Sequence, residues 1–112
     1  MEDKVLKEVL QVILDNKAED VVYLNVSKVN PLTEYFIICT VSSNRQALSV
    51  AKYAETVFHK HQVEVKHIEG NSTSEWILVD ASDYIIHIFV KDARIRYGLE
   101  KMWTDLPIIK VG

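Results

Sequence analysis

Two aspartates, Asp80 and Asp83, flank a short break between two apolar runs of the chain. A pair of carboxylates can bind a metal ion or perform acid/base chemistry. The surrounding sequence supplies no third ligand and no glycine-rich phosphate loop. Aspartate also favours turns, because its side chain accepts hydrogen bonds from nearby backbone amides. We therefore expect the pair to shape a turn, a role that is compatible with a rim charge for a basic partner.

The histidines are a second candidate for chemistry. His59, His61 and His67 together suggest a metal cluster, but residues two apart on a helix point in different directions, and His67 is expected on the next strand. We favour a solvated helix end, where a histidine interacts well with the helix dipole. His87 is expected in the middle of a strand, as a half-buried and hydrogen-bonded residue and not as a catalyst.

Two further candidates have structural explanations. Cys39 lies in an apolar run with no neighbouring cation to lower its pKa, so we expect an unreactive core residue. Residues 42–45 begin a helix after a strand, where an anion could dock. This turn has no glycine that would let the backbone approach a phosphate. Ser43 and Gln46 match a capping box, so capping is the expected role.

Trp76 and Trp103 are the strongest candidates for a binding surface. As a core residue, each could contribute on the order of 4–6 kcal/mol by buried area, an upper estimate. As an interface anchor, tryptophan is the residue type whose truncation often costs ~2 kcal/mol or more. The apolar helical neighbour Leu99 favours the core for Trp103. Both interpretations of Trp76 remain open, because polar residues share its strand face.

The elements that position these residues begin with a β-hairpin, predicted from two runs rich in β-branched and aromatic residues. With Ala81 and Ser82 as the loop, the opposed pairs are Asp80 with Asp83, Leu78 with Ile85, and Trp76 with His87. Strand alternation gives the hairpin two faces. The mixed face carries Trp76, Leu78, Asp80, Asp83, Ile85, His87 and Phe89. The apolar face, which suits a core, carries Ile77, Val79, Tyr84, Ile86 and Ile88.

Hydrophobic periodicity predicts the remaining elements. Helices are expected at residues 3–16, about 44–61 and 94–103, and further strands at residues 21–26, 35–41 and 63–68. The run 35–41 is apolar throughout, which indicates a central strand covered on both faces. The strand–helix–strand unit over 35–68 predicts a right-handed crossover with parallel strands. The fold class is therefore α/β, with the order α-β-β-α-β-β-β-α and a mixed, roughly five-stranded sheet with flanking helices.

Composition bounds the class of protein. The 112 residues suit one domain, 1–112, and 48% apolar with 26% charged residues is a globular balance. A net charge of −3 argues against a primary nucleic-acid binder and permits a basic protein partner. The single cysteine excludes an internal disulfide and suits a reducing compartment. No membrane-spanning run, signal peptide or transit peptide is recognisable, so the expected location is the cytoplasm.

Short motifs run along nearly the whole chain in a specific order. In the first half they are residues 17–20 (Lys-Ala-Glu-Asp), 33–40 (Thr-Glu-Tyr-Phe-Ile-Ile-Cys-Thr) and 42–46 (Ser-Ser-Asn-Arg-Gln). In the second half they are Glu69-Gly70, residues 76–80, Asp83, residues 87–89, Arg94, Tyr97 and residues 99–103. Each motif is weak alone, but the set resembles the ribosomal silencing factor family, also called Iojap.

The chain departs from the family pattern at a few positions. The family usually has Asp at Glu34, Gly at or beside Val41, Gly at Ser82 and a polar residue at Gly98. Ser82 bears on the geometry of a tight turn. Gly98 is expected to loosen the last helix by up to ~1 kcal/mol.

The resemblance implies a non-enzymatic repressor of translation. Such proteins bind the large ribosomal subunit through ribosomal protein L-fourteen and sterically block its association with the small subunit, which lowers translation under nutrient limitation. The resemblance also implies a nucleotidyltransferase-like fold. This chain lacks the Gly-Ser phosphate loop and the spaced aspartates of such enzymes, so we expect no enzymatic activity, cofactor or metal. Homodimers occur among relatives, and the sequence leaves the oligomeric state open.

We expect the docking surface to combine the mixed hairpin face with the C-terminal segment. Buried aromatic anchors would supply affinity, and acidic charges would steer a basic partner. The residues expected in this surface are Trp76, Leu78, Asp80, Asp83, His87, Tyr97, Glu100 and Trp103.

Two other functions are alternatives to docking. One is a small metal- or nucleotide-dependent enzyme of nucleotidyltransferase-like fold, built on Asp80, Asp83 and His87. The other is an RNA binder, which requires a basic stripe. The relevant basic residues are scattered among acids: Lys52, Lys60, Lys66, Arg94, Arg96 and Lys101.

Overall fold

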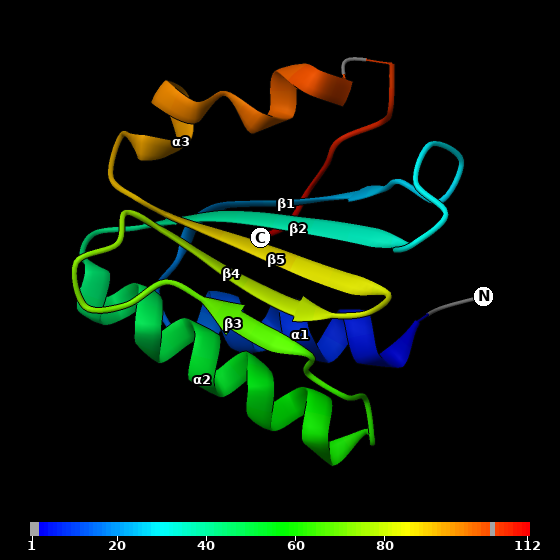
Figure 1. Ribbon diagram of the computed structural model, residues 1–112, viewed down its shortest axis with the longest axis horizontal. Coiled ribbons are helices and arrows are strands. Elements are labelled where there is room, and N and C mark those ends of the chain that lie inside the picture. The colour runs from blue at the N-terminus through cyan, green and yellow to red at the C-terminus, as the bar shows by residue number, and fades with distance from the viewer. Residues whose placement is uncertain (1–2, 104) are drawn as a thin grey trace.

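One mixed β-sheet organises the molecule, and helices cover its two faces unequally (Figure 1). The computed structural model describes residues 3–103 and 105–112, without the side chain of Trp103. The elements in chain order are α1 (Lys4–Asp15), β1 (Glu19–Asn25), β2 (Tyr35–Val41), α2 (Asn44–Lys60), β3 (His67–Glu69), β4 (Trp76–Ala81), β5 (Tyr84–Val90), α3 (Ala93–Tyr97), the 3-10 helix η1 (Leu99–Trp103) and β6 (Ile109–Lys110).

The described residues form a six-stranded sheet in the order β3-β4-β5-β2-β1-β6. Only the β2–β5 pair is parallel among these neighbours. The predicted mixed α/β sheet is confirmed, but it has β6 as an additional strand, which pairs with β1 through Val22 and Tyr23. The two residues of β6 are too few to produce a periodic signal in the sequence.

The prediction for residues 35–68 gave the correct relative direction of its two strands, but these strands are not neighbours in the sheet. β3 is antiparallel to β4, β4 is antiparallel to β5, and β5 is parallel to β2, so β3 and β2 run the same way. The hairpin β4–β5 nevertheless lies between them. β2 has buried side chains on both faces, as predicted for a central strand.

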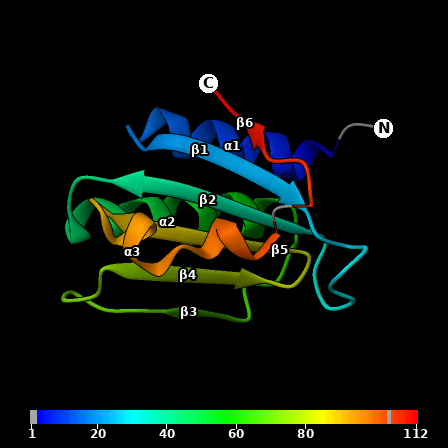
Figure 2. The same cartoon turned by 90° about the horizontal axis from the view of Figure 1, so that it is seen from above.

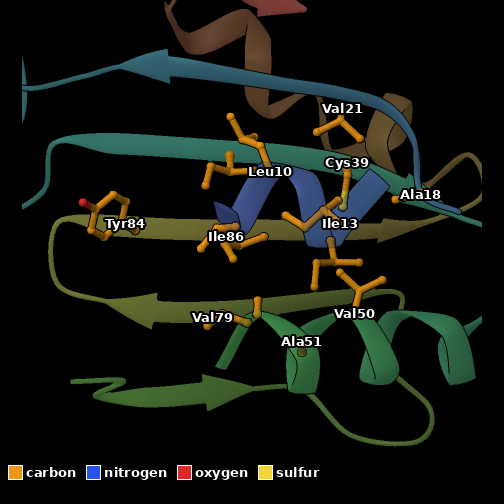
Figure 3. Close-up of a cluster of buried hydrophobic side chains, with 14 of the residues drawn as sticks. Leu10, Ile13, Ala18, Val21, Cys39, Val50, Ala51, Val79, Tyr84 and Ile86 are labelled. Atoms are coloured by element: carbon orange, nitrogen blue, oxygen red, sulfur yellow. The ribbon is translucent and has the colours of Figure 1, made fainter. Parts of the chain in front are cut away.

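α1 and α2 together cover one face of the sheet (Figure 1). Their apolar sides meet the aliphatic residues of the central strands, and Figure 3 shows this cluster. The side chains of Ile13, Ile37, Phe58 and Ile86 are fully buried there. Small residues on α2, such as Ala51, let the helix lie close to the sheet. This layer contains most of the buried hydrocarbon and supplies most of the stabilisation from apolar burial.

Both helices begin at side-chain caps. Asp3 Oδ1 accepts a hydrogen bond from the amide of Leu6 at 3.0 Å, and Ser43 Oγ accepts one from the amide of Gln46 at 3.1 Å. The predicted capping box is only half formed, because Gln46 Oε1 accepts from the amide of Ser42 at 2.9 Å and not from that of Ser43. The Gln46 amide group also donates to the carbonyl of Asn16 at 3.0 Å. It therefore ties the start of α2 to the end of α1.

The β4–β5 hairpin keeps the predicted faces but not the predicted register. Ser82 and Asp83 form its turn, so Trp76 lies opposite Phe89 and Leu78 opposite His87. The shift moves each partner by two residues, which preserves the face of every strand residue. The predicted pair of Asp80 with Asp83 is wrong, since Asp80 lies opposite Ile85. Ser82 adopts φ 65°, the left-handed conformation that favours glycine.

α3 and η1 lie on the other face of the sheet (Figure 1). The predicted continuous helix over residues 94–103 is interrupted, because Gly98 ends α3 with φ 57°. A smaller cluster lies beneath, containing Leu24, Phe36, Ile38, Phe89 and Leu99.

Cys39 lies in the centre of β2 and is fully buried, as predicted. Burial raises the pKa of its thiol to about 12. Within the described ranges, every helix is too short or too polar to cross a bilayer.

Candidate partner-binding surface

Trp76 is the centre of an aromatic cluster on the α3 side of the sheet. Its ring centroid lies 4.9 Å from that of Phe89, 5.7 Å from that of His87 and 4.8 Å from that of Tyr97. Alternation along β4 buries Ile77 and Val79 beneath α2 and leaves Trp76 only partly covered. The indole therefore has one side packed and one side accessible, which is suitable for an interface anchor.

His87 holds the Trp76 indole in place. Trp76 Nε1 donates to His87 Nδ1 at 3.2 Å, so Nδ1 is the acceptor and the proton of the neutral imidazole is on Nε2. Only 4% of His87 is exposed, and burial lowers its pKa to about 4. Among the described residues, Nε2 has no hydrogen-bond partner. The expected hydrogen bond is confirmed, but His87 is more deeply buried than predicted and supports the surface from beneath.

A hollow of about 470 Å³ opens beside Trp76. Its lining residues are Glu69, Gly70, Ser74, Glu75, Trp76, Leu78 and Tyr97. Two carboxylates, two aromatic rings and one aliphatic side chain are thus presented together. Carboxylates pair with cations, and aromatic faces attract them. The hollow can accept the side chain of a lysine or arginine from a partner.

Glu75 already has a cationic partner within the chain. Arg96 donates to both Glu75 oxygens, at 2.8 and 3.1 Å, and this interaction holds the pKa of the Glu75 carboxyl below its usual value. Both side chains are about half exposed, at 51% each. An ion pair in water contributes little net stability. Glu75 can therefore exchange Arg96 for a cation supplied by another molecule.

Asp80 and Asp83 lie away from this hollow. Asp80 is four residues along β4 from Trp76, about 13 Å at the usual rise of a strand. Asp80 Oδ1 accepts from the amide of Ser82 at 3.1 Å, which confirms its expected turn role. Asp83 lies in the turn and not on the mixed strand face, contrary to the prediction. Its exposed side chain leaves it available, while its carbonyl accepts from the amides of Glu34 and Tyr35.

Glu100 pairs with Arg94, a residue whose structural role the sequence did not reveal. Arg94 Nε and Nη2 donate to the two Glu100 oxygens at 2.7 and 3.1 Å. Arg94 Nη1 also donates to Thr40 Oγ1 at 3.1 Å and to the carbonyl of Asp20, in an irregular part of β1. Only 11% of the Arg94 side chain is exposed. The pair ties α3 and η1 to β1 and β2 beneath them.

The C-terminal residues differ in how accessible they are. Tyr97 is 52% exposed and lies against Trp76, so the structure brings these two predicted residues together. Trp103 belongs to η1, but its side chain lies outside the described residues. Ile95 and Met102 are exposed on the same segments and were not singled out. The sequence could have indicated these two residues, because each is an apolar side chain within a polar helical segment.

The histidines expected not to cluster are distributed over separate contacts. His61 Nε2 lies 2.8 Å from Glu8 Oε1, and His67 Nε2 lies 3.3 Å from Glu69 Oε1. Within residues 3–103 and 105–112, no group of three or more His, Cys, Asp or Glu is arranged to hold a metal ion.

The fold is a small mixed α/β domain, and one sheet face is only half covered and carries an anchored tryptophan beside carboxylates, which is the chemistry of a surface suited to binding another protein. Over residues 1–112 the chain matches the family model RsfS, described as ribosomal silencing factor during starvation. It is 33% identical to the ribosomal silencing factor RsfS of Halalkalibacterium halodurans, over 96% of this chain and 92% of that protein. It is 35% identical to RsfS of Bacillus subtilis, over 84% and 80%. The chain belongs to the ribosomal silencing factor family.

Solved structures and organellar proteins extend this similarity. A crystal structure of a Chromobacterium violaceum protein matches with a TM-score of 0.85 and 31% identity, over 100% of this chain and 95% of that one. One from Bacillus halodurans matches with a TM-score of 0.83 and 32% identity, over 98% and 100%. Chloroplastic Iojap of Zea mays is 31% identical over 85% of this chain and 41% of its own length. A Mus musculus protein named for mitochondrial assembly of the ribosomal large subunit is 29% identical, over 85% and 43%.

Proposed function

We propose that this protein represses translation in the cytoplasm by binding the large ribosomal subunit. In this proposal it docks on ribosomal protein L-fourteen, blocks association with the small subunit and lowers translation under nutrient limitation. Membership of the silencing factor family supports the role. The name of the mouse relative, which refers to the ribosomal large subunit, supports the choice of subunit.

The observation that carries the proposal is the acidic and aromatic hollow beside Trp76. Proteins that bind ribosomal RNA need basic residues to neutralise phosphate charge. A basic side chain of such a protein fits between Glu69, Glu75 and the ring of Tyr97. Acidic residues at the rim would steer the approach of this partner, and desolvation of Trp76 would supply affinity.

The predicted surface residues take distinct parts in this proposal. Trp76, Leu78 and Tyr97 form the apolar contact, and Trp103 stays a predicted member of the surface. Asp80 and Asp83 extend the acidic rim towards the β4–β5 turn. Two residues act indirectly: His87 positions the Trp76 indole, and Glu100 holds η1 through Arg94.

Steric exclusion is a sufficient mechanism for repression. The molecule measures 35 × 33 × 25 Å along its principal axes. Contacts between macromolecules form only where their surfaces approach to a few ångströms. A body of this thickness, held on the joining surface by an interface of about 800 Å² per partner, keeps the two subunits apart. No bond is made or broken.

A matched pair of tyrosines tests the docking face. Tyr97, beside Trp76, is 52% exposed, and Tyr53, on α2 beneath the opposite face, is 51% exposed. We expect Tyr97→Ala to weaken cosedimentation with isolated large subunits at least tenfold and Tyr53→Ala to leave it unchanged. Equal effects of the two variants, or full binding by Tyr97→Ala, would refute this docking face.

A second experiment tests the consequence of docking. We expect the protein to reduce the recovery of joined ribosomes when isolated large and small subunits are mixed and sedimented. The Tyr97→Ala variant should reduce it less. If the protein binds the large subunit without any effect on joining, the proposed partner is supported and the proposed steric mechanism is refuted. Sedimentation of the free protein in the same series measures whether it forms a homodimer.

A further inference from the structure

A groove of about 800 Å³ lies on the same side of the sheet as the hollow beside Trp76, but towards β1 and β6. Figure 2 shows α3 and η1 above β5, with β1 and β6 to one side of them. Val22 and Thr40 form the floor of this groove. Arg94 and Ile95 of α3 form one wall, and the segment around Lys110 forms the other.

The groove concentrates positive charge. Its cationic residues are Lys91, Arg94, Lys101 and Lys110, and its acidic side chains are Asp20 and Glu100. Glu100 is neutralised by its two hydrogen bonds from Arg94. Among the described residues, none of the three lysines forms an ion pair. In a chain whose net charge is −3, this is a local positive site.

The elements around the groove direct these lysines towards one space. Lys110 lies opposite Val22 in the β1–β6 pair, and opposed residues share a face of the sheet. This places Lys110 on the face that α3 occupies. Lys101 comes from η1, and Lys91 follows β5 in a left-handed conformation with φ 55°. Three separate parts of the chain thus supply lysines to the same lining.

The groove also has an apolar part and the dimensions of a small-molecule site. Ile95, Ile108 and Val111 line it beside the lysines. Its volume lies within the ~300–1,000 Å³ that is usual for ligand pockets. An extended RNA would need a row of cations along several phosphates, and the negative net charge of the protein opposes a long polyanion. A compact ligand with several negative charges and an apolar portion fits better.

We propose that this groove binds a small phosphorylated ligand of the nucleotide class. Lys91, Lys101 and Lys110 contact its phosphate oxygens, and Ile95 and Ile108 contact its organic portion. Arg94 stays paired with Glu100 and keeps the wall in place. No described residue lines both this groove and the hollow beside Trp76, so ligand binding in the groove can be tested apart from ribosome binding.

Adenosine triphosphate, inorganic triphosphate and adenosine are the probes for this site. By titration calorimetry and thermal unfolding of the whole chain, we expect both phosphate compounds to bind and to raise the midpoint temperature. Adenosine triphosphate should bind more tightly than inorganic triphosphate because of the apolar wall. The double variant Lys91→Gln/Lys110→Gln should lose at least tenfold in affinity. The matched control Lys52→Gln/Lys66→Gln removes two charges outside the lining and should bind like the parent protein.

Several outcomes would overturn the proposal. One is the absence of binding by either phosphate compound up to about 1 mM. Another is an equal loss of affinity in the two double variants, which would indicate a response to net charge alone. Adenosine binding as tightly as adenosine triphosphate would show that phosphate is not recognised. Tighter binding of a short single-stranded RNA than of adenosine triphosphate would identify an RNA contact instead.

Discussion

The two faces of the sheet are packed with different kinds of side chain. Beneath α1 and α2, aliphatic side chains from five strands and two helices form a continuous buried layer. Beneath α3 and η1, the layer is smaller and contains Trp76, Phe36 and Phe89 with a buried histidine among them. Two hollows flank α3 on this second face. The first face holds the fold together, and the second face leaves surface available for other molecules.

This difference has a physical origin in the lengths of the covering helices. α1 and α2 comprise 12 and 17 residues, whereas α3 and η1 comprise five each. Short segments cannot cover six strands, so the sheet residues they leave open must tolerate water. Thr40, Trp76 and Asp80 occupy such positions, together with the partly exposed Leu78 and Ile85.

The largest expected effect comes from the covered face. Phe58→Ala removes a fully buried ring from α2 and should lower the free energy of unfolding by about 3–5 kcal/mol. Trp76→Ala removes a larger but half-covered ring from the open face and should cost less, about 2 kcal/mol. Urea denaturation of both variants measures the difference. A loss for Trp76→Ala as large as that for Phe58→Ala would contradict the contrast between the faces.

We expect acid to lower the free energy of unfolding through His87, which lies on the sheet face beneath α3 and η1. Its pKa is about 4 in the folded chain, below the usual 6.5, so protonation favours the unfolded chain. Stability is complete above pH about 6.5 and falls towards pH 4, by roughly 3 kcal/mol for this group. His87→Asn keeps an acceptor for Trp76 and removes the titration. In urea unfolding from pH 7 to pH 4.5, the free energy of unfolding should decline less for the variant than for the parent protein. Equal declines would show that His87 is not the group responsible.

Two arginines on α3 allow a sharper comparison of buried and exposed pairs. Arg94→Met leaves the partly buried Glu100 without its partner and should cost about 2–3 kcal/mol in unfolding free energy. Arg96→Met breaks an exposed pair with Glu75 and should change stability little. Thermal and urea unfolding of the two variants provide the measurement. Equal losses would show that Arg94 does not tie α3 to the sheet.

The smallest expected effect concerns the turn that joins β4 and β5. Ser82→Gly relieves a left-handed backbone conformation and should raise stability by about 0.5 kcal/mol, after the entropy of the glycine in the unfolded chain is subtracted. Asp83 does not have a positive φ, so Asp83→Gly is the control and should lower stability. Precise urea midpoints distinguish the two, and a loss of stability in Ser82→Gly would contradict the argument.

The β4–β5 hairpin shows what a strand pattern can and cannot predict. The division of its residues between two faces was correct because alternation has a period of two. The register was wrong because the turn is Ser82-Asp83 and not Ala81-Ser82. Small polar residues make several adjacent turns equally plausible in sequence. Shifting the turn by one residue moves each partner by two, so the register error left the faces intact.

The candidate site was predictable only where neighbours in the hairpin supply it. The contact between Trp76 and His87 was predicted from a directly opposed pair. That register is wrong, but both residues lie on one face of two adjacent strands and form their hydrogen bond as diagonal neighbours. The Arg94 contacts join residues that are 54 and 74 positions apart, and periodicity carries no information on such pairs. The acidic rim of the hollow was missed for a different reason. Glu75 directly precedes Trp76 in the chain, but the position of Glu69 beside them depends on how the loop between the two glutamates folds back and pairs β3 with β4.

The buried sulfur of Cys39 has a practical consequence. Its thiol lies on one of the two central strands, within the layer beneath α1 and α2, and has almost no thiolate at neutral pH, so an alkylating reagent can reach it only when this buried layer opens. The rate of modification of the unaltered chain would therefore report how often this layer opens. The native cysteine thus serves as a probe of this opening, and no engineered label is needed.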